Sequence, residues 1–589
     1  MKKRTQIPEK YKWDLTSVIK DAAEIEQIFK IMEKMTTILP KYKDKLNNPD
    51  ILYERLTKCE KEFIQINKLA YFLSNMKNTD ASNVKILEYI QKFINLETKL
   101  DQANAFFVPQ LYKLEDNYLK SLLLDKRFKD YDNMIRDIIK LKPHKIDEKT
   151  NEILSKMGSF LGDNENIHSI LRDAEIRYED IVDSKGKIHK LDTANYSSFL
   201  HSKDPQLRKN AFNSMMQAYG NLNKTLTELY LKDIELDKFS CSISNYNSVL
   251  ERELIENDVP RAVFDNIVKY TNENIPLLQE FVKTQARISK NKNFSYYDLF
   301  EERSNKTKYT IEQAQEIMLD ALSPLCDEYI GLVKKKLNDK SIDYLPNENK
   351  YTGAYNSHCY GAKTVILMNF KDNYNSLSTL VHEMGHCINA EYFLMAQPQQ
   401  KADITIFAAE IASTVNEILL SQYLLKNATK REKIYYLQQF LDNVRSTIYR
   451  QTLFTEFELF AHQKIENEEN ITYKDLNECY TKLNKKYYGN SCKIPKSMQY
   501  EWSLVPHFYS AYYVYTYATG MVTAITLATR ILNEPDFYKK YIYFLKNGTN
   551  KPSIDVLKEI GIDLTQEEPY KIAFGYIKRQ LNDYKSLCK

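Results

Sequence analysis

Apolar residues in the first third of the chain recur at helical spacing. Between about residues 15 and 175 they fall three and four positions apart, as in Ile25, Ile28, Phe29 and Met32, and short polar stretches such as KNTDASN separate the runs. Residues three and four apart share one face of a helix. This region is therefore predicted to form packed helices.

The pattern changes near residue 180. The stretch EDIVDSKGKIHKL, residues 179–191, has short extended pieces on both sides of Lys185-Gly186, which predicts a β-hairpin and a domain boundary. We therefore expect a helical N-terminal domain over 1–190 and a second domain over 191–589. Helical periodicity resumes after Asp204, with Pro205 just inside the predicted helix start.

Two stretches without apolar periodicity, about 291–310 and 338–356, predict loops. TVILMNF, residues 364–370, follows the second loop, and its β-branched and apolar residues predict a buried or edge strand. A helix containing VHEMGHCINAEY, residues 381–392, comes next. Another helix is predicted over 402–420, with Asp403 as its N-cap and a polar stripe formed by Glu410, Ser413, Thr414 and Glu417.

Composition supports a mainly α fold. Only 13 glycines and 16 prolines interrupt 589 residues, so long helices are expected, and the length requires more than one small core. Lys plus Arg, 83, nearly balance Asp plus Glu, 79, without a basic stripe, so nucleic acid is not an expected partner. The eight cysteines are scattered without a CxxC pair, which favours free thiols in a reducing compartment.

The two stretches that bear on location are the N-terminus and residues 503–529. The start, MKKRTQIPEK, has Pro, Glu and Lys where a signal peptide needs an apolar run, so a cytoplasmic protein is expected. Residues 503–529 contain no Asp, Glu, Lys or Arg and are long enough to span a bilayer. Because they include Pro506, His507, Gly520 and five tyrosines, a buried helix is favoured and a membrane span is the alternative.

The motif His-Glu-x-x-His lies in HEMGH, residues 382–386. On a helix His382 and His386 project from one face and can bind one ion, and Glu383 can take a proton from a zinc-activated water. The alternative is two histidines with ordinary hydrogen-bond partners. Cys387 points elsewhere on the helix and is expected to be a packing residue.

A catalytic zinc site needs a third protein ligand and an open position. The motif HExxHxxGxxH is absent, because Asn389 and Tyr392 occupy the places of its Gly and third His. Glu410 on the following helix is the predicted third ligand, since small residues around it allow close approach to a neighbour. Glu417 is predicted to orient a ligand histidine by a hydrogen bond. A solvated helix face is the alternative for both.

Attack of an activated water on a carbonyl group also needs a donor for the developing oxyanion. His507 opens HFYSAYYVYTY, which places Tyr509, Tyr512, Tyr513 and Tyr515 within reach on what is predicted to be one helix. The chain has 44 tyrosines, so each of these is individually more typical of a core residue. His507, one of nine histidines, is the more specific candidate.

Several segments together resemble one known family, the oligoendopeptidase F group of the thimet oligopeptidase family of zinc metallopeptidases. The resemblance covers nearly the whole length and rests on segments in the family's order: YKWDL (11–15), DPQLRKNAF (204–212), YNSVLE (246–251), KYTGAY (350–355), ILMNF (366–370), HEMGH (382–386), FAAEIASTVNE (407–417) and PHFYSAYYVYTYATG (506–520). Many relatives carry a third histidine where this chain has Asn389.

The resemblance implies roles for the site residues. His382, His386 and Glu410 would bind one Zn2+ per chain, and Glu383 would be the general base. His507, Tyr509 and Tyr515 would stabilise the transition state. A loop would close over the substrate through Gly353, Ala354 and Tyr355.

The resemblance also implies the fold and the activity. A helical N-terminal domain would enclose a zincin-like catalytic domain with a small β-sheet, around a deep channel that admits short unfolded peptides. A peptide would add as a strand to the edge formed by residues 364–370. The expected function is a cytoplasmic zinc-dependent oligoendopeptidase that cuts internal peptide bonds. A non-catalytic peptide-binding protein and a protease anchored through 503–529 are the alternatives, and the oligomeric state stays open.

Overall fold

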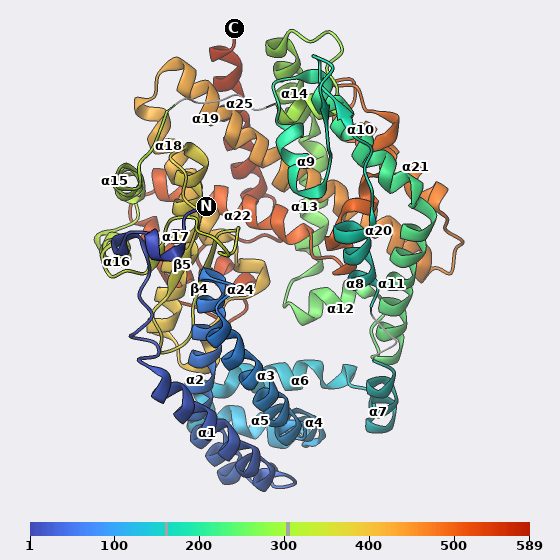
Figure 1. The fold of residues 1–589 in the computed structure, drawn as a ribbon. Helices are drawn as coiled ribbons and strands as arrows, with labels where there is room; N and C mark the ends of the chain where they lie inside the picture. The colour runs from blue at the N-terminus through green and yellow to red at the C-terminus, as the bar shows by residue number, and fades with distance from the viewer. Residues whose placement is uncertain (159–162, 302–306) are drawn as a thin grey trace. The chain divides into compact units, whose positions relative to one another are not determined.

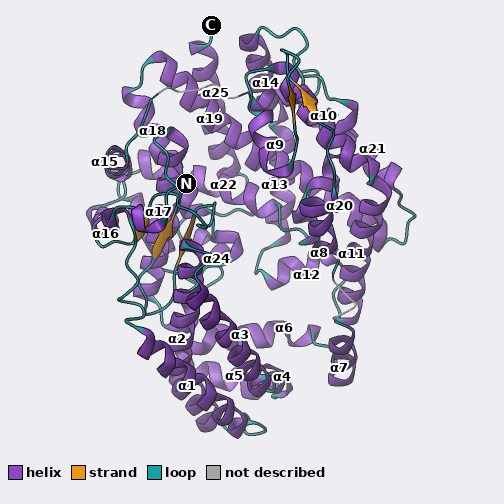
Figure 2. Cartoon of the chain, viewed as in Figure 1, coloured by secondary structure: helices purple, strands orange, loops and turns teal. Residues whose placement is uncertain are grey.

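Helices dominate the computed structural model, which describes residues 1–158, 163–301 and 307–589 (Figure 1). Strands are few and short in the part of the chain that is described (Figure 2). The mainly α fold with a small sheet is therefore confirmed.

The chain folds into two compact units, each assembled from three separated segments. The first unit contains residues 1–143, 306–423 and 530–561, and the second contains residues 144–305, 424–529 and 562–589. Each unit thus combines parts that are far apart in the sequence. The domain boundary expected after residue 190 and the deep channel stay predictions.

The helices of the first unit come from all three of its segments. They are α1 (Ala22–Ile38), α2 (Pro49–Thr79), α3 (Val84–Asn104), α4 (Phe107–Lys113), α5 (Asp116–Leu124), α6 (Asp132–Leu141), α15 (Ile311–Leu322), α16 (Asp327–Asn338), α17 (Tyr374–Ala396), most of α18 (Ile411–Asn427), α23 (Phe537–Leu545) and α24 (Ser553–Glu559). The periodicity read in the N-terminal region is confirmed, because Ile25, Ile28, Phe29 and Met32 are buried on one face of α1.

A three-stranded sheet lies in the first unit. Its strands are β3 (Ile342–Asp343), β4 (Tyr355–Ser357) and β5 (Val365–Leu367), with β5 in the centre, parallel to β3 and antiparallel to β4. Val365 and Leu367 belong to the same apolar core as α1. The prediction of a buried strand is confirmed, but the expectation that 364–370 offers an open edge to a peptide is wrong, since both sides of β5 are hydrogen-bonded. The strand β4 is the edge on the other side of β5 from β3.

A buried lysine ties the sheet to the loop that precedes β4. The Lys350 ammonium has no exposed side-chain surface and donates to Asp343 Oδ1 at 2.6 Å, Leu345 O at 2.7 Å and Met368 O at 2.7 Å. Arg4, near the N-terminus, donates to the other oxygen of Asp343 at 2.7 Å. A buried cation needs such partners, because unpaired burial of a charge is very costly. The segment leading to the edge strand is therefore firmly held.

The second unit contains the predicted hairpin. Strands β1 (Ile181–Val182) and β2 (Ile188–His189) pair antiparallel, with Gly186 at φ 80° in the turn. The helix predicted after Asp204 is confirmed as α10 (Pro205–Asn221), whose N-terminal amides are capped by the Asp204 carboxylate. The other helices are α7 (Glu148–Met157), α8 (Asn164–Ile170), α9 (Thr193–Leu200), α11 (Asn223–Ile243), α12 (Val249–Glu256), α13 (Arg261–Glu273), α14 (Ile275–Ser289), α19 (Lys430–Val444), α20 (Arg450–Glu466), α21 (Tyr473–Tyr488), most of α22 (Tyr515–Asn533) and α25 (Glu568–Leu587).

The uncharged segment 503–529 is not one helix. A short 3-10 turn spans Pro506–Tyr509, the chain turns again, and α22 begins at Tyr515. Pro506 lacks an amide proton for a helical hydrogen bond, and Tyr512 has a left-handed backbone, φ 53°, which an α-helix cannot contain. The prediction that His507 and the tyrosines share one helix is therefore wrong. Among the described residues, no helix combines the length and the apolar character needed to cross a membrane.

Candidate metal centre

Helix α17 carries the His-Glu-x-x-His motif. It begins after Asn373, whose side-chain oxygen accepts a hydrogen bond from the Ser376 amide at 2.9 Å. The sequence KDNYNS thus ends the loop after β5 and caps the helix. His382 and His386, four residues apart, lie on one face as predicted.

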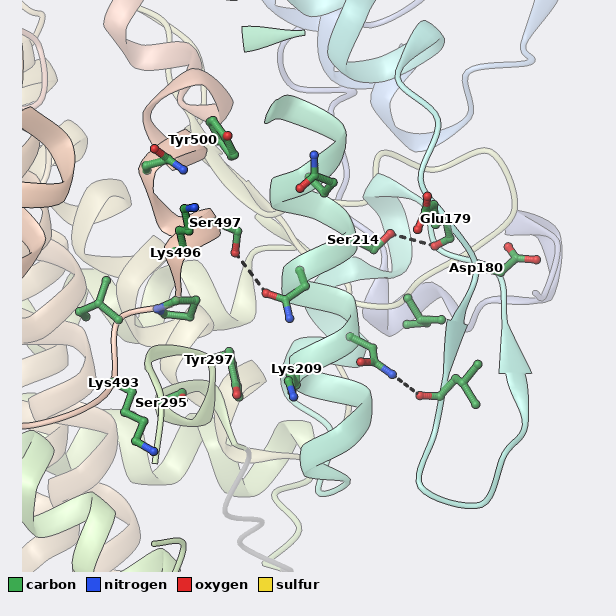
Figure 3. Close-up of a pocket in the computed structure, with 18 residues that line it drawn as sticks. Glu179, Asp180, Lys209, Ser214, Ser295, Tyr297, Lys493, Lys496, Ser497 and Tyr500 are labelled. Atoms are coloured by element: carbon green, nitrogen blue, oxygen red, sulfur yellow. Dashed lines mark hydrogen bonds between the residues drawn. The ribbon is translucent and has the colours of Figure 1, made fainter. Parts of the chain in front are cut away.

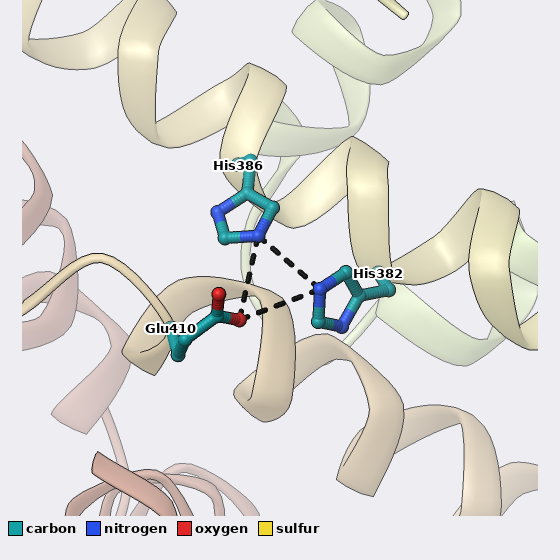
Figure 4. A group of neighbouring side chains, drawn as sticks. All are labelled: His382, His386 and Glu410. Atoms are coloured by element: carbon teal, nitrogen blue, oxygen red, sulfur yellow. Dashed lines mark hydrogen bonds and ion pairs between the residues drawn. The ribbon is translucent and has the colours of Figure 1, made fainter. Parts of the chain in front are cut away.

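Glu410 joins the two histidines (Figure 4). His382 Nε2 lies 3.2 Å from His386 Nε2 and 3.4 Å from Glu410 Oε2, and His386 Nε2 lies 3.5 Å from the same oxygen. In a tetrahedral zinc site, donor atoms about 2.0–2.1 Å from the ion stand about 3.3–3.4 Å apart. The three donors therefore fit a single zinc ion without rearrangement, and they are the one such cluster of His, Cys, Asp and Glu found among the described residues.

The helix that follows begins later than predicted. Residues 402–410 form turns, including a 3-10 turn over 406–408, and α18 starts at Ile411. Asp403 does not cap this helix, because its carboxylate accepts from the Ile404 amide at 2.8 Å and lies 3.7 Å from His358 Nε2. Glu410 thus stands just before the first turn of α18 rather than on a stripe along it. Glu410 does lie beside the two histidines, but its predicted place on a polar stripe within the helix is wrong.

A glycine allows α18 to approach α17. A β-carbon on Gly385 would lie 2.6 Å from Ser413 Cα and 2.7 Å from the Ala412 carbonyl oxygen, which is closer than any side chain tolerates. Asn416, fully buried, donates to the Val381 carbonyl at 3.3 Å and accepts from the Tyr329 hydroxyl at 3.0 Å. The small residues predicted to permit close helix contact therefore do so, opposite the glycine of the motif.

Glu417 lies in contact with the first motif histidine. Its Oε1 is 2.9 Å from His382 Nδ1, so Nε2, the other ring nitrogen, is directed toward the cluster. Burial lowers the pKa of His382, but the carboxylates of Glu417, Glu410 and Glu383 outweigh this and raise it to about 9. A metal ion that binds here must therefore displace a proton. A carboxylate on the distal nitrogen of a ligand histidine is the usual orienting partner.

Glu410 favours its ionised form although burial opposes the charge. Burial raises its pKa, but hydrogen bonding and charge from His386, with His382 and the Ser413 hydroxyl, lower the pKa to about 2. The Ser413 hydroxyl donates to Glu410 Oε2 at 3.1 Å. The cluster consequently offers two imidazoles and one carboxylate, the donor set of a catalytic zinc site with an open position.

Glu383 lies beside the cluster and is 7% exposed. Burial raises its pKa, while His382, His386 and the backbone amide of Asn356 act to lower it. A raised pKa brings a carboxylate closer to the range where it exchanges protons efficiently at neutral pH. Asn356 belongs to the edge strand β4 and lines the same pocket as Glu383.

A pocket of about 430 Å³ in the first unit contains the cluster. Two of the three predicted loop residues line it, Ala354 and Tyr355. Gly353 is not among the lining residues, and its carbonyl accepts from the Asn369 side chain at 2.9 Å. The further lining residues are Asn356, His358, His382, Glu383, His386, Asn389, Ala390, Phe393, Ile404, Ala409 and Glu410. Asn389 is 4% exposed, and Cys387 is fully buried, as expected of a packing residue.

The second unit groups His507 with two tyrosines. The ring of His507 stacks on Tyr513, with centroids 5.9 Å apart at 7°, and meets Tyr517 edge-on at 5.9 Å. The Tyr517 hydroxyl donates to the Tyr513 hydroxyl at 3.3 Å. We call His507, Tyr513 and Tyr517 the donor cluster. Tyr517 escaped the sequence analysis, although its spacing of four from Tyr513 was a usable signal.

Tyr509 and Tyr515 lie outside the donor cluster. Tyr515 is 3% exposed and its ring meets Phe264 edge-on at 5.3 Å. Tyr509 packs against His168 at 4.9 Å and Tyr230 at 6.2 Å. The structure does not bring these two rings to His507, and their transition-state roles stay predictions.

A second pocket, of about 910 Å³, lies in the second unit beside the hairpin and α10 (Figure 3). Ser214 donates to the Glu179 carbonyl at 2.9 Å, and the Ser497 hydroxyl donates to Asn213 at 3.1 Å. The lining includes Lys209, Lys493 and Lys496 but no histidine or cysteine. It therefore lacks the imidazoles that the first pocket holds.

Comparisons with known proteins identify relatives of the chain. The sequence pattern of peptidase family M3 matches residues 198–576, and that of oligopeptidase F matches residues 110–178. The chain is 34% identical to oligopeptidase PepF of Bacillus subtilis over 100% of this chain and 89% of that protein. It is 30% identical to an oligoendopeptidase F homolog of Borreliella burgdorferi over 99% of each.

Solved structures share the fold. A crystal structure of a Chlamydophila abortus protein superposes with a TM-score of 0.94 at 29% identity, covering 100% of both chains. Oligoendopeptidase F from Enterococcus faecium superposes with a TM-score of 0.73 at 26% identity, covering 96% of this chain and 99% of that one. The chain therefore belongs to peptidase family M3, in its oligoendopeptidase F group, and is a metalloendopeptidase.

Proposed function

We propose that the chain is a zinc-dependent oligoendopeptidase that cuts internal bonds of short unfolded peptides. The observation that carries this proposal is the arrangement of His382, His386 and Glu410, whose donor atoms lie 3.2–3.5 Å apart. That spacing suits zinc, and the buried Glu383 beside it supplies a base. The names of the relatives, oligopeptidase and oligoendopeptidase F, support short peptides as substrates.

The residues divide the chemistry between them. A bound Zn2+ would polarise the scissile carbonyl and make a water molecule more acidic. Glu383 accepts a proton from the attacking water as its oxygen bonds to the carbonyl carbon, and it delivers a proton to the amine nitrogen when the carbon–nitrogen bond breaks. Glu417 holds His382 in the tautomer and orientation that binding requires.

The donor cluster is assigned to the oxyanion. His507, Tyr513 and Tyr517 combine an imidazole with two phenolic hydroxyls, and each can donate a hydrogen bond to a developing negative charge. This assignment moves the tyrosine role from Tyr509 and Tyr515 to the two rings that contact His507.

Backbone pairing with β4 is the proposed basis of peptide binding. Asn356 of this edge strand interacts with Glu383, and its neighbours Ala354 and Tyr355 line the same pocket. A peptide added to this edge would be held through its main chain, which favours broad sequence tolerance. A cytoplasmic location and the absence of nucleic-acid partners stay predictions.

The test is digestion of a peptide pool of mixed lengths, read by mass spectrometry, alongside the zinc content of the purified protein. We expect about one zinc per chain, internal cleavage of short peptides, loss of cleavage with a chelator and recovery on adding zinc. Cleavage that survives complete removal of metal would overturn the proposal. Release of terminal residues alone would overturn the endopeptidase part of it.

A further inference from the structure

Three side chains of the second unit form a buried polar cluster that the proposed reaction does not use. Glu458 and His462 lie one turn apart on α20, and both face Tyr512. Their exposed fractions are 0%, 1% and 2%. We call these residues the Glu458 cluster.

The cluster holds Tyr512 through its backbone and its ring. Glu458 Oε1 accepts a hydrogen bond from the Tyr512 amide at 2.5 Å. The ring of Tyr512 packs on His462 at 4.8 Å and meets Phe264 edge-on at 5.8 Å. Tyr512 has φ 53°, a left-handed conformation that side-chain-bearing residues rarely adopt and that persists only when its surroundings fix it.

Tyr512 lies at the turn that joins the parts of the donor cluster. On one side, the Ser510 amide donates to the His507 carbonyl at 3.1 Å, closing the turn that carries His507. On the other, the Tyr513 amide donates to the Ser510 carbonyl at 3.1 Å, and the Tyr517 amide donates to Val514 O at 3.3 Å as α22 begins. The backbone of Tyr512 therefore sets the direction of the chain between His507 and both donor tyrosines.

A carboxyl group is a costly way to fill this space. Glu458 Oε2, His462 Nδ1 and the Tyr512 hydroxyl are buried and have no hydrogen-bond partner among the described residues. Burial raises the pKa of Glu458 well above its ordinary value, against the Tyr512 amide, which lowers it. Burial lowers the pKa of His462 to about 3. Apolar side chains would fill the same volume at less cost, so the acceptor oxygen needs a separate reason.

We propose that Glu458 is a positioning residue, whose carboxyl oxygen fixes the left-handed turn at Tyr512 and thereby places His507, Tyr513 and Tyr517 for the reaction. This inference rests on the proposed role of the donor cluster. This positioning role requires a hydrogen-bond acceptor where Oε1 of Glu458 lies, within reach of the Tyr512 amide. It does not require a negative charge.

The requirement is tested by two substitutions of one residue. Glu458→Gln keeps an acceptor oxygen at the same reach, and its kcat is expected to stay within about threefold of the unaltered enzyme. Glu458→Asp keeps a carboxyl group but withdraws it by one methylene, and kcat is expected to fall about 10- to 100-fold with KM unchanged, as misplaced catalytic groups do. Equal kcat for the two variants, whether both high or both low, would overturn the proposal.

Thr455→Val is the matched control. Thr455 is fully buried on the same helix, and its hydroxyl donates to the Gln451 carbonyl within α20, away from Tyr512. Its loss perturbs the helix without removing the Tyr512 contact. A fall in kcat equal to that of Glu458→Asp, at similar thermal stability, would show a merely structural role and overturn the proposal.

A double substitution separates this inference from the proposed function. If Glu458 acts through the donor cluster, Glu458→Asp should lower kcat less in a Tyr517→Phe background than in the unaltered enzyme. Full additivity would overturn the inference and leave the donor assignment intact. If Tyr513→Phe and Tyr517→Phe each keep full kcat, the donor assignment itself fails, and the inference fails with it.

Discussion

The candidate metal cluster of the first unit, formed by His382, His386 and Glu410, and the donor cluster of the second unit are built on different kinds of backbone. His382 and His386 lie within a long regular helix, and Glu410 stands directly before another. His507, Tyr513 and Tyr517 are spread over a 3-10 turn, a left-handed residue and the start of α22. The first arrangement follows from helical geometry, whereas the second needs neighbouring groups to hold it.

The two regions also differ in how their buried polar atoms are satisfied. Around the metal cluster, Glu417 contacts His382 and Ser413 contacts Glu410. Around the donor cluster, Glu458, His462 and Tyr512 retain buried atoms without partners among the described residues. The comparison suggests that the first site is stabilised by its own contacts, while the second depends on a polar support that costs stability.

The largest effect is expected from Glu383→Gln, which removes the base without removing a ligand. We expect kcat to fall about 10²- to 10⁴-fold, because general base catalysis contributes that much, with the zinc content unchanged. Kinetics with a quenched peptide and metal analysis measure both. Full activity in this variant would contradict the proposed reaction, and a loss of zinc would show that Glu383 supports the metal site instead.

The donor cluster should give the next largest effect. Tyr513→Phe and Tyr517→Phe each remove one hydroxyl, and we expect kcat to fall about 10²- to 10³-fold for each, as for other oxyanion donors. Tyr515→Phe is the control, since its ring lies in the core against Phe264, and its kcat should stay within about threefold. If Tyr515→Phe instead lowered kcat more than Tyr513→Phe and Tyr517→Phe, the result would favour the role for Tyr515 that was expected from the sequence.

Glu417→Ala should weaken metal binding rather than chemistry. The carboxylate 2.9 Å from His382 Nδ1 orients that ligand, and loss of such partners lowers metal affinity about 10- to 100-fold. Competition with a zinc-binding dye measures the affinity. Glu417→Gln keeps an acceptor oxygen. Its zinc affinity should therefore lie between that of Glu417→Ala and that of the unaltered protein. Unchanged zinc affinity in both would show that the regular helix alone suffices.

Gly385→Ala should give the smallest effect. The added β-carbon meets backbone atoms of α18 at 2.6–2.9 Å, and such overpacking costs about 1–3 kcal/mol of unfolding free energy. Thermal unfolding of the metal-free protein measures it. Gly331→Ala on α16 is the control, because nothing lies within 4 Å of its added carbon and alanine favours a helix. Equal stability of the two variants would mean that α18 can move away freely.

Regular periodicity made the grouping of His382, His386 and Glu410 predictable. The helix of the motif, the strand before it and the pairing of Glu410 with the histidines could all be inferred, because each follows from local spacing and residue type. The start of α18 could not, since Asp403 is a good N-cap by type, and only the folded chain directs its carboxylate to His358. The central place of β5 could not be inferred either, because it depends on strands about 10 and 24 residues away in the sequence.

The donor region was harder because its conformation is not periodic. The uncharged segment 503–529 suggested one buried helix through His507. The left-handed turn at Tyr512 depends on Glu458, 54 residues earlier in the chain, and no local pattern reports that contact. The sequence therefore named Tyr513 among several candidate tyrosines near His507, without singling it out, and did not name Tyr517.

The buried Lys350, in the loop before the edge strand β4, bears on how this part of the fold is held together when no metal ion is bound. Its ammonium gathers carboxylate and carbonyl oxygens from Asp343, Leu345 and Met368 in the manner of a structural cation, yet it is covalently part of the chain. Unlike a bound ion, it cannot dissociate or be exchanged. The strand and loop beside the candidate metal site are therefore held in place by atoms of the chain itself, with or without a metal ion in that site.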